Sequence, residues 1–237
     1  FYIKQSYEDM WTDFRGEFGK TIISIWVDEP SYGRSGMPWM PQLPELFRER
    51  WGFDILPHIE SLYNDLPESS RVRYCYRMLI AELLENAYFR MVREWCNTNG
   101  VWFSGHLMME DTMTGTIARA AHTMPYYKYF DIPGIDRLTA GMNWRNMEIK
   151  EPGGRIARRH NAYTTPLQCT SAAHQSGAGH ILAEMYGVTS QNMAFREQRC
   201  MFDSYAVMGI NHRSVHGIFY SLRGRGKRAF PVHVNYY

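Results

Sequence analysis

The chain of 237 residues is 45% hydrophobic and has a formal net charge of +2. This length and hydrophobic content suffice for one large core, and the small net charge argues against nucleic acid or an anionic membrane as a partner. No apolar run approaches the ~18–20 residues that a membrane span requires. The four cysteines lie far apart with no CxxC pair, which argues against a zinc ribbon or a disulfide scaffold.

Helical and strand-like patterns alternate along the chain, apart from an insertion at about 31–70 that is rich in proline and aromatic residues. Within this insertion we expect helices over 43–52 and 52–65. The strongest pattern, over 71–96, repeats apolar residues every four positions and ends at Asn99-Gly100. The expected order outside the insertion is helix 7–18, strand 21–27, helix 71–96, strand 101–111, helix 116–130, strand 135–141, polar loop 142–158, helix 165–175, strand 180–187, helix 192–208 and strand 210–221.

Five successive β-units predict an α/β fold with a parallel sheet, either doubly wound or a barrel. A doubly wound nucleotide-binding sheet should carry a glycine-rich turn after a strand, and the chain has none there; the FGKT stretch at 18–21 precedes its strand instead. We therefore expect a TIM (β/α)8-type barrel, with residues 1–237 forming part of one domain. The chain begins with Phe1 and ends in a strand-like stretch, so we also expect it to be a piece of a longer protein.

Three predicted strands end near a glutamate, namely Glu29, Glu110 and Glu184. In barrels the active site lies at the carboxyl ends of the strands. Two other predicted strands lie between the strand that ends near Glu29 and the strand that ends near Glu184. These two side chains are therefore expected to face each other across the barrel mouth. Such a pair can cleave a glycosidic bond, one residue protonating the leaving oxygen and the other acting as nucleophile or base. Each acid alone could equally cap a helix or pair with an arginine, and the sequence leaves retention and inversion both open.

Other polar and aromatic residues near the strand ends are candidate sugar contacts. Asp28 precedes Glu29 and points to the opposite face of its strand, which suits a structural role or a bond to a sugar hydroxyl. Aromatic rings at strand ends can stack on the apolar face of a sugar. The expected substrate-binding residues are Asp28, His106, Glu110, Tyr186, Asn211 and His216.

Two alternatives remain open from the residues alone. His106 and Glu110, like His212 and His216, lie four apart, and these four residues could instead bind zinc in a metal-dependent hydrolase of barrel fold. Neither HExxH nor a GxSxG nucleophile motif is present. A non-catalytic carbohydrate-binding barrel is the second alternative.

Several stretches together resemble the catalytic barrel of large bacterial glycoside hydrolases of the α-L-rhamnosidase type and of clan-A barrels. They are VDEPSYG at 27–33, NGVWFSGHLMMED at 99–111, DIPGID at 131–136, HILAEMYG at 180–187 and GINHRSVHGIFYSLRGRGKRAFP at 209–231. The resemblance implies that the chain holds the later strands, about four to eight, and that the first strands and further domains lie elsewhere in the same protein.

The resemblance also implies site roles, a cofactor and a substrate class. Glu29 would match the acid at the end of the fourth strand and Glu184 that of the seventh, with Glu110 lining the site from the fifth. Where relatives often have Ser-Glu, this chain has Ala183-Glu184, which leaves the carboxylate in place. Calcium is a candidate cofactor, and the substrate would be an oligosaccharide or a plant or bacterial polysaccharide. Bacterial exported, periplasmic and cytoplasmic locations all stay open.

Overall fold

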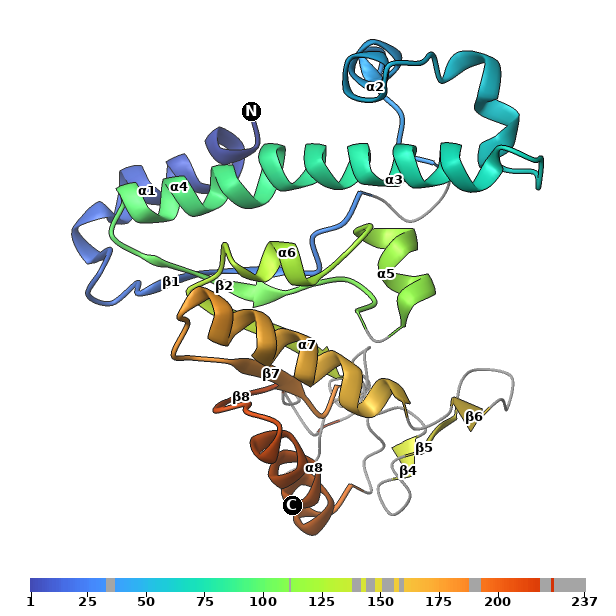
Figure 1. The fold of residues 1–237 in the computed structure, drawn as a ribbon. Coiled ribbons are helices and arrows are strands. Elements are labelled where there is room, and N and C mark those ends of the chain that lie inside the picture. Colours follow the sequence, from blue (N-terminus) through green and yellow to red (C-terminus); the bar gives the residue numbers. More distant parts are fainter. Residues whose placement is uncertain are drawn as a thin grey trace.

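The computed structural model describes residues 1–32, 37–110, 112–137, 142–143, 148–150, 156–157, 160–187, 193–217 and 223. At its centre lies a sheet of five strands, all parallel to their neighbours, in the order β1-β2-β3-β7-β8 (Figure 1). The strands are β1 Ser24–Asp28, β2 Trp102–His106, β3 Ile132–Arg137, β7 Leu182–Met185 and β8 His212–Val215. This sheet confirms the α/β class and the run of parallel β-units. Within the described residues it is an open half-barrel rather than a closed barrel of eight strands.

Helices connect the strands and cover the sheet, with α4 against β2 and α7 against β3 (Figure 1). Among the described residues, no helix combines the length and apolar character needed to cross a bilayer. The helical segments are η1 Lys4–Glu8, α1 Asp9–Phe14, η2 Arg15–Glu17, α2 Leu43–Trp51, η3 Leu56–Leu62, α3 Ser69–Leu84, η4 Glu85–Arg90, α4 Met91–Thr98, α5 Met113–Arg119, α6 Met124–Tyr127, α7 His160–Ser176 and α8 Phe195–Val207.

The long helix expected over 71–96 is present as α3, η4 and α4 without a break (Figure 1). Its central segment η4 is a π-helical turn. Phe89, Val92 and Cys96 on its inner face are fully buried in the main core. The helix is followed by Gly100 in the left-handed region at φ +69°, the conformation that glycine adopts most readily.

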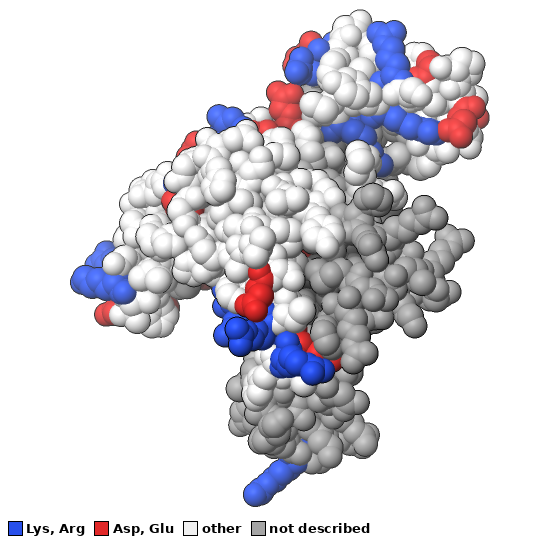
Figure 2. All heavy atoms as spheres, turned by 60° about the horizontal axis from the view of Figure 1, so that its bottom comes forward, with Lys and Arg blue, Asp and Glu red and all other residues white. Residues whose placement is uncertain are grey.

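The insertion forms a small core of its own against the first half of α3. Leu43 and Phe47 of α2, Ile55 and Tyr76 are fully buried there, in a cluster distinct from the core that lies under the sheet. Figure 1 shows α2 standing away from the sheet, and Figure 2 shows charged side chains of both signs over the end of the molecule that carries the insertion. Ion pairs such as Arg48–Asp54 link these charges, so this face is mixed rather than basic.

The region between β2 and β3 differs from the expectation. A single helix over 116–130 was predicted, but α5 and α6 are two short helices. Ala121 between them is left-handed at φ +66°, and Pro125 lies in the first turn of α6, where its ring is tolerated. The third strand is Ile132–Arg137 rather than 135–141, and the expected positions 138–141 lie outside the described residues.

The predicted polar loop at 142–158 contains a second, antiparallel sheet. Its three short strands are β4 Met142–Asn143, β5 Glu148–Lys150 and β6 Ile156–Ala157, in the order β4-β5-β6. Their lengths of two and three residues are too short for alternation to predict from sequence. The last expected strand is also shorter than predicted, because β8 ends at Val215, and 218–221 lie outside the described residues.

Candidate active site

Acidic and histidine side chains from four neighbouring strands meet at the carboxyl edge of the parallel sheet. The strand register aligns Asp28 of β1 with His106 of β2, and Asp136 of β3 with Glu184 of β7. Glu29 follows β1 directly. Since alternate residues of a strand point to the same face, Trp26 and Asp28 face away from the buried Ile25 and Val27, toward the concave side of the sheet.

Two glycines allow the first three strands to approach closely at this edge. Gly105 precedes His106 and has φ +139°, and a Cβ atom there would lie 2.1 Å from the Val27 carbonyl oxygen. A Cβ atom on Gly134 of β3 would lie 2.7 Å from the Gly105 carbonyl oxygen. Any larger residue would therefore push β1, β2 and β3 apart. This close approach of the strands accompanies the convergence of His106, which follows Gly105, and Asp136, two residues after Gly134.

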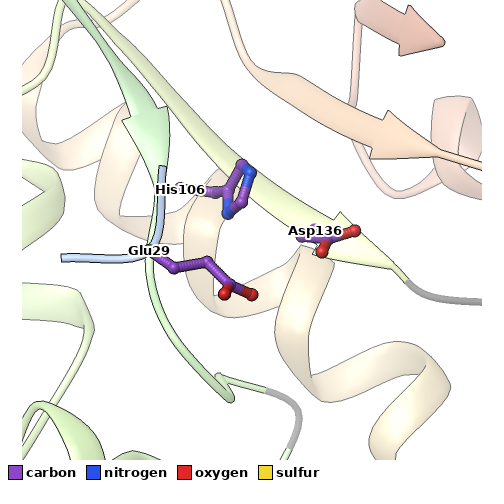
Figure 3. A group of neighbouring side chains, drawn as sticks. All are labelled: Glu29, His106 and Asp136. Atoms are coloured by element: carbon purple, nitrogen blue, oxygen red, sulfur yellow. The ribbon is translucent and has the colours of Figure 1, made fainter. Parts of the chain in front are cut away.

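Glu29 itself has a left-handed backbone, at φ +52°. This conformation is uncommon outside glycine and costs on the order of 1–3 kcal/mol, so the surrounding structure must impose it. The turn directs the Glu29 side chain toward His106 and Asp136 (Figure 3). One potential ligand atom from each of these three residues lies within 4.8 Å of the other two.

His106 is the centre of the site, with a side chain that is only 1% exposed. Its Nε2 atom lies 2.9 Å from Glu184 Oε2 and 3.5 Å from Asp28 Oδ1. Burial alone would lower the pKa of His106, but the hydrogen bond with Glu184 and the negative charges of Glu110, Asp136 and Glu184 outweigh it and raise this pKa to about 9. His106 is therefore an imidazolium at neutral pH.

Glu184 is held as a carboxylate. Its hydrogen bond with His106 is the largest influence and lowers the pKa of Glu184 despite burial, with the charges of His106 and His216 acting in the same direction. His216 Nε2 lies 3.8 Å from Glu184 Oε1. The carboxylate thus has a histidine beside each oxygen.

The pKa values of Asp136 and Glu110 are shifted in the opposite direction, upward. Burial is the main cause that raises the pKa of Asp136 to about 7; the charge of His106 opposes this rise, and the charges of Glu184, Glu29 and Asp28 add to it. Burial raises the pKa of Glu110 well above its usual range, although Glu110 Oε1 accepts a 3.0 Å hydrogen bond from the Asp136 backbone N–H. The site therefore combines one carboxyl group whose pKa is lowered with two whose pKa values are raised, the separation of pKa values typical of acid–base catalysis.

Several sequence-predicted residues lie elsewhere. Tyr186 is left-handed at φ +72° and fully buried, and its hydroxyl donates to the Gln198 carbonyl oxygen. Asn211 lies at the amino edge of the sheet, where its amide donates to the Gly179 carbonyl oxygen and accepts from the Ile181 N–H. Neither side chain points to the acidic cluster. The structure brings together Asp28, Glu29, His106, Glu184 and His216, with Glu110 directly behind them.

The four residues considered for zinc do not gather in one place. His212 begins β8 and its ring lies 2.8 Å from that of His180 at the amino edge, whereas His106, Glu110 and His216 lie toward the carboxyl edge. Among the residues that the structure describes, Glu29, His106 and Asp136 have potential ligand atoms close enough to share one cation, which His106 could bind only as a neutral imidazole. The two carboxylates suit calcium, which prefers oxygen ligands, whereas the histidine nitrogen suits zinc better.

Asp136 is the site residue that the sequence analysis missed. The predicted third strand began at Ile135, so Asp136 fell near its start rather than its end. The strand actually begins at Ile132 and continues through Pro133-Gly134, a pair that reads as a turn. The available signal was an acid two residues after Pro133-Gly134, in the segment that leads to the carboxyl end of the strand.

Comparisons with known proteins add the family. The family model described as alpha-L-rhamnosidase (Glyco_hydro_106) matches residues 1–221. The chain belongs to this alpha-L-rhamnosidase family. Membership confirms the resemblance to rhamnosidase-like glycoside hydrolases, and no curated protein sequence matches the chain.

A solved structure supports the fold of this rhamnosidase-family chain. It is titled "Structure of Rhamnosidase from Novosphingobium sp. PP1Y", is 20% identical in sequence and superimposes with a TM-score of 0.66. The match covers 90% of the present chain and 19% of the Novosphingobium chain. At this identity the likeness shows the fold, and the chain spans about a fifth of that relative's length.

Proposed function

We propose that the chain supplies the catalytic carboxyl groups of an enzyme that hydrolyses α-L-rhamnosides. Family membership supports the substrate class. The observation that carries the mechanism is that Glu184 contacts His106 at 2.9 Å, while Glu29 reaches the same histidine from a strand on the other side of it. Two carboxyl groups that converge on one position from different strands can act on opposite sides of a glycosidic bond.

Glu184 is proposed as the nucleophile or general base. Both roles require an ionised carboxylate at neutral pH, and the contact with the His106 imidazolium keeps Glu184 in that state. His216 lies beside the other carboxylate oxygen and can donate to a sugar hydroxyl when a substrate is bound.

Glu29 is proposed as the general acid. Its side chain points into the cluster, toward Asp136 and His106, where it can reach the oxygen of a glycosidic bond (Figure 3). The excess of carboxyl groups over histidines also favours the positive charge that develops on the sugar ring in an oxocarbenium-like transition state. Asp28 and Asp136 are proposed as further sugar contacts, since both lie at the same edge.

Calcium remains a proposed cofactor. Bound at this edge, it would offset negative charge and orient sugar hydroxyls, and Glu29 and Asp136 are the carboxylates that could hold it. A carboxylate bound to calcium is ionised, so Glu29 cannot ligate the ion and donate a proton at the same time. Residual activity after chelation, together with the calcium content of the intact protein, separates these two roles for Glu29.

The leaving group decides whether Glu29 is the acid. In the intact protein, Glu29→Gln should lower kcat for a rhamnosyl disaccharide by about 10³-fold or more, but much less for 4-nitrophenyl α-L-rhamnoside, because nitrophenolate leaves without protonation. Glu184→Gln should slow both substrates alike. The exposed Glu49 of α2 provides the control, and Glu49→Gln should change neither rate. Equal losses on the two substrates for Glu29→Gln would contradict its assignment as the acid.

A further inference from the structure

Two histidine rings meet at the amino edge of the parallel sheet, at the end of the strands opposite the acidic cluster. His180 precedes β7 and His212 begins β8, and His180 Nδ1 lies 2.8 Å from His212 Nε2. The ring centroids are 4.7 Å apart, and the ring planes make an angle of 79°. Both residues are exposed, so an ion can reach the pair from solvent.

Hydrogen bonds between the two chain segments hold both histidines in place. The Ile181 N–H donates to Asn211 Oδ1 at 2.8 Å, and Asn211 Nδ2 donates to the Gly179 carbonyl oxygen at 2.8 Å. The His212 N–H donates to the Ile181 carbonyl oxygen at 2.9 Å. The backbone on each side of the pair is therefore tied to the other strand, and little ordering is needed before the pair binds a ligand.

Trp102 packs beside the pair. Its ring centroid lies 5.6 Å from that of His180, with the ring planes 34° apart. Trp102 lies four residues before His106 on β2, so alternation places both side chains on one face of the sheet. The same spacing relates His212 to His216. At about 3.3 Å per residue, the pair lies about 13 Å along the strands from the acidic cluster, too far to act on a sugar bound there.

The distance between the two nitrogen atoms matches one kind of metal centre. Two imidazole nitrogens at about 2.0–2.1 Å from an ion lie about 2.9 Å apart when the angle at the ion is 90°, and about 3.3 Å apart in a tetrahedron. The separation of 2.8 Å agrees with the right-angled case. Cu²⁺ and Ni²⁺ favour right-angled coordination, whereas Zn²⁺ favours a tetrahedron and would have to push the rings apart.

We propose that His180 and His212 bind one divalent transition-metal ion of right-angled geometry, Ni²⁺ or Cu²⁺, which links β7 to β8. His180 Nδ1 and His212 Nε2 are the ligands. The hydrogen that one of these atoms carries in the pair transfers through water to the remote nitrogen of its own ring, so that both atoms present a lone pair. Among the described residues no third histidine, cysteine or carboxylate lies close enough to share the ion, so water completes its coordination. The inference does not depend on the proposed hydrolysis, which uses neither residue.

Calorimetric titration of the intact, tag-free protein with NiCl₂ at pH 7.5 tests the pair, with excess Ca²⁺ present to occupy carboxylate sites. Ni²⁺ should bind with Kd below about 100 µM, and more tightly than Zn²⁺ by about threefold or more. His180→Ala and His212→Ala should each weaken binding by about tenfold or more, because each removes one of two protein ligands. His174→Ala is the matched control, since His174 is exposed on α7 outside the pair, and it should stay within about twofold. Ni²⁺ binding that survives either substitution in the pair, no binding below about 1 mM, or tighter binding of Zn²⁺ would overturn the proposal.

Tryptophan fluorescence locates the ion independently and covers the case in which a histidine variant fails to fold. Trp102 lies beside His180 at the amino edge, whereas the Trp26 ring lies 5.5 Å from that of His106 at the carboxyl edge. A bound Cu²⁺ ion quenches the nearest indole. Addition of Cu²⁺ should therefore quench the unsubstituted protein and Trp26→Phe to a similar extent, and Trp102→Phe much less. Quenching that is lost in Trp26→Phe and kept in Trp102→Phe would place the ion at the acidic cluster and overturn the proposal.

Discussion

The two edges of the parallel sheet carry similar residue types in very different states. At the amino edge, Asp131 accepts from the Phe103 N–H at 2.8 Å and pairs with Arg93, and both ends of the Asn211 amide are bonded. At the carboxyl edge, buried His106 Nδ1 and Asp136 Oδ1 have no hydrogen-bond partner among the described residues. Polar residues at the amino edge therefore stabilise the sheet, whereas the unpaired atoms of His106 and Asp136 support the proposal that the carboxyl edge binds a ligand.

The largest effect on activity is expected from a substitution of Glu184 at the carboxyl edge. Glu184→Gln should lower kcat by about 10³-fold, because the neutral amide can neither attack nor accept a proton. The variant should still fold, but the free energy of unfolding should fall by about 1–3 kcal/mol, because the amide can still accept a hydrogen bond from His106 while the buried imidazolium loses its charged partner. Steady-state kinetics of the intact protein measures the change in kcat, and thermal unfolding measures the change in stability. Unfolding of the variant at a much lower temperature would mean that Glu184 is chiefly structural.

The next effect concerns the histidine that both proposed catalytic acids approach. His106→Gln removes the cation that lowers the pKa of Glu184. The acidic limb of the kcat/KM profile should therefore move to higher pH, with a loss of about 10–100-fold at pH 5 that narrows as the pH rises. A uniform loss across the profile would show that His106 does not set the ionisation of Glu184.

The amino edge should show the reverse pattern. Asp131→Ala leaves the Phe103 N–H and Arg93 without their acceptor, at a cost of about 2 kcal/mol in the free energy of unfolding. Activity per folded molecule should stay within about twofold, because the substitution is far along the strand from the cluster. Asp131→Asn keeps an oxygen acceptor and should be less destabilising. Urea unfolding of the intact protein, followed at matched pH, measures both variants.

A smaller effect is expected in the pH dependence of stability. The pKa of Asp136 is about 7 in the folded state against 3.8 as its ordinary value, so the folded protein binds more protons over that window. Stability should therefore fall as the pH rises from about 4 to about 7. Asp136→Asn should remove roughly 1–2 kcal/mol of this fall. The titration of His106 falls outside this pH range. Its raised pKa stabilises the folded state fully below about pH 6.5, and this stabilisation is lost only as the pH rises through about 9. Unfolding at pH 4.5 and pH 7 should show a flatter dependence for the variant, and an unchanged slope would contradict the assignment.

Much of the sheet and part of the site could be predicted from the sequence for a simple physical reason. Apolar strand segments that end in carboxylates place those groups at one edge of a parallel sheet, which is how Glu29 and Glu184 were selected. Asp136 was missed because Pro133-Gly134 reads as a turn, while the structure uses Gly134 for close contact with β2. That use depends on a neighbouring strand and is invisible along a single sequence.

Two further residues show where local pattern fails. Alternation places Tyr186 on the same face as Glu184, but its left-handed backbone at φ +72° turns the ring into the core. Asn211 and His216 are both predicted sugar contacts in one strand-like stretch, 210–221, yet they lie at opposite edges of the sheet. The sequence identified the stretch, and only the strand boundaries decide which end of it faces the site.

A crystal structure of the intact protein with bound L-rhamnose tests the central claim most directly. Our account predicts that the sugar lies at the carboxyl edge of the sheet, with the carboxyl groups of Glu29 and Glu184 on opposite sides of its anomeric carbon and His106 in contact with Glu184. A rhamnose ring that touches only one of these two glutamates, or that binds at the amino edge near Asn211, would contradict it.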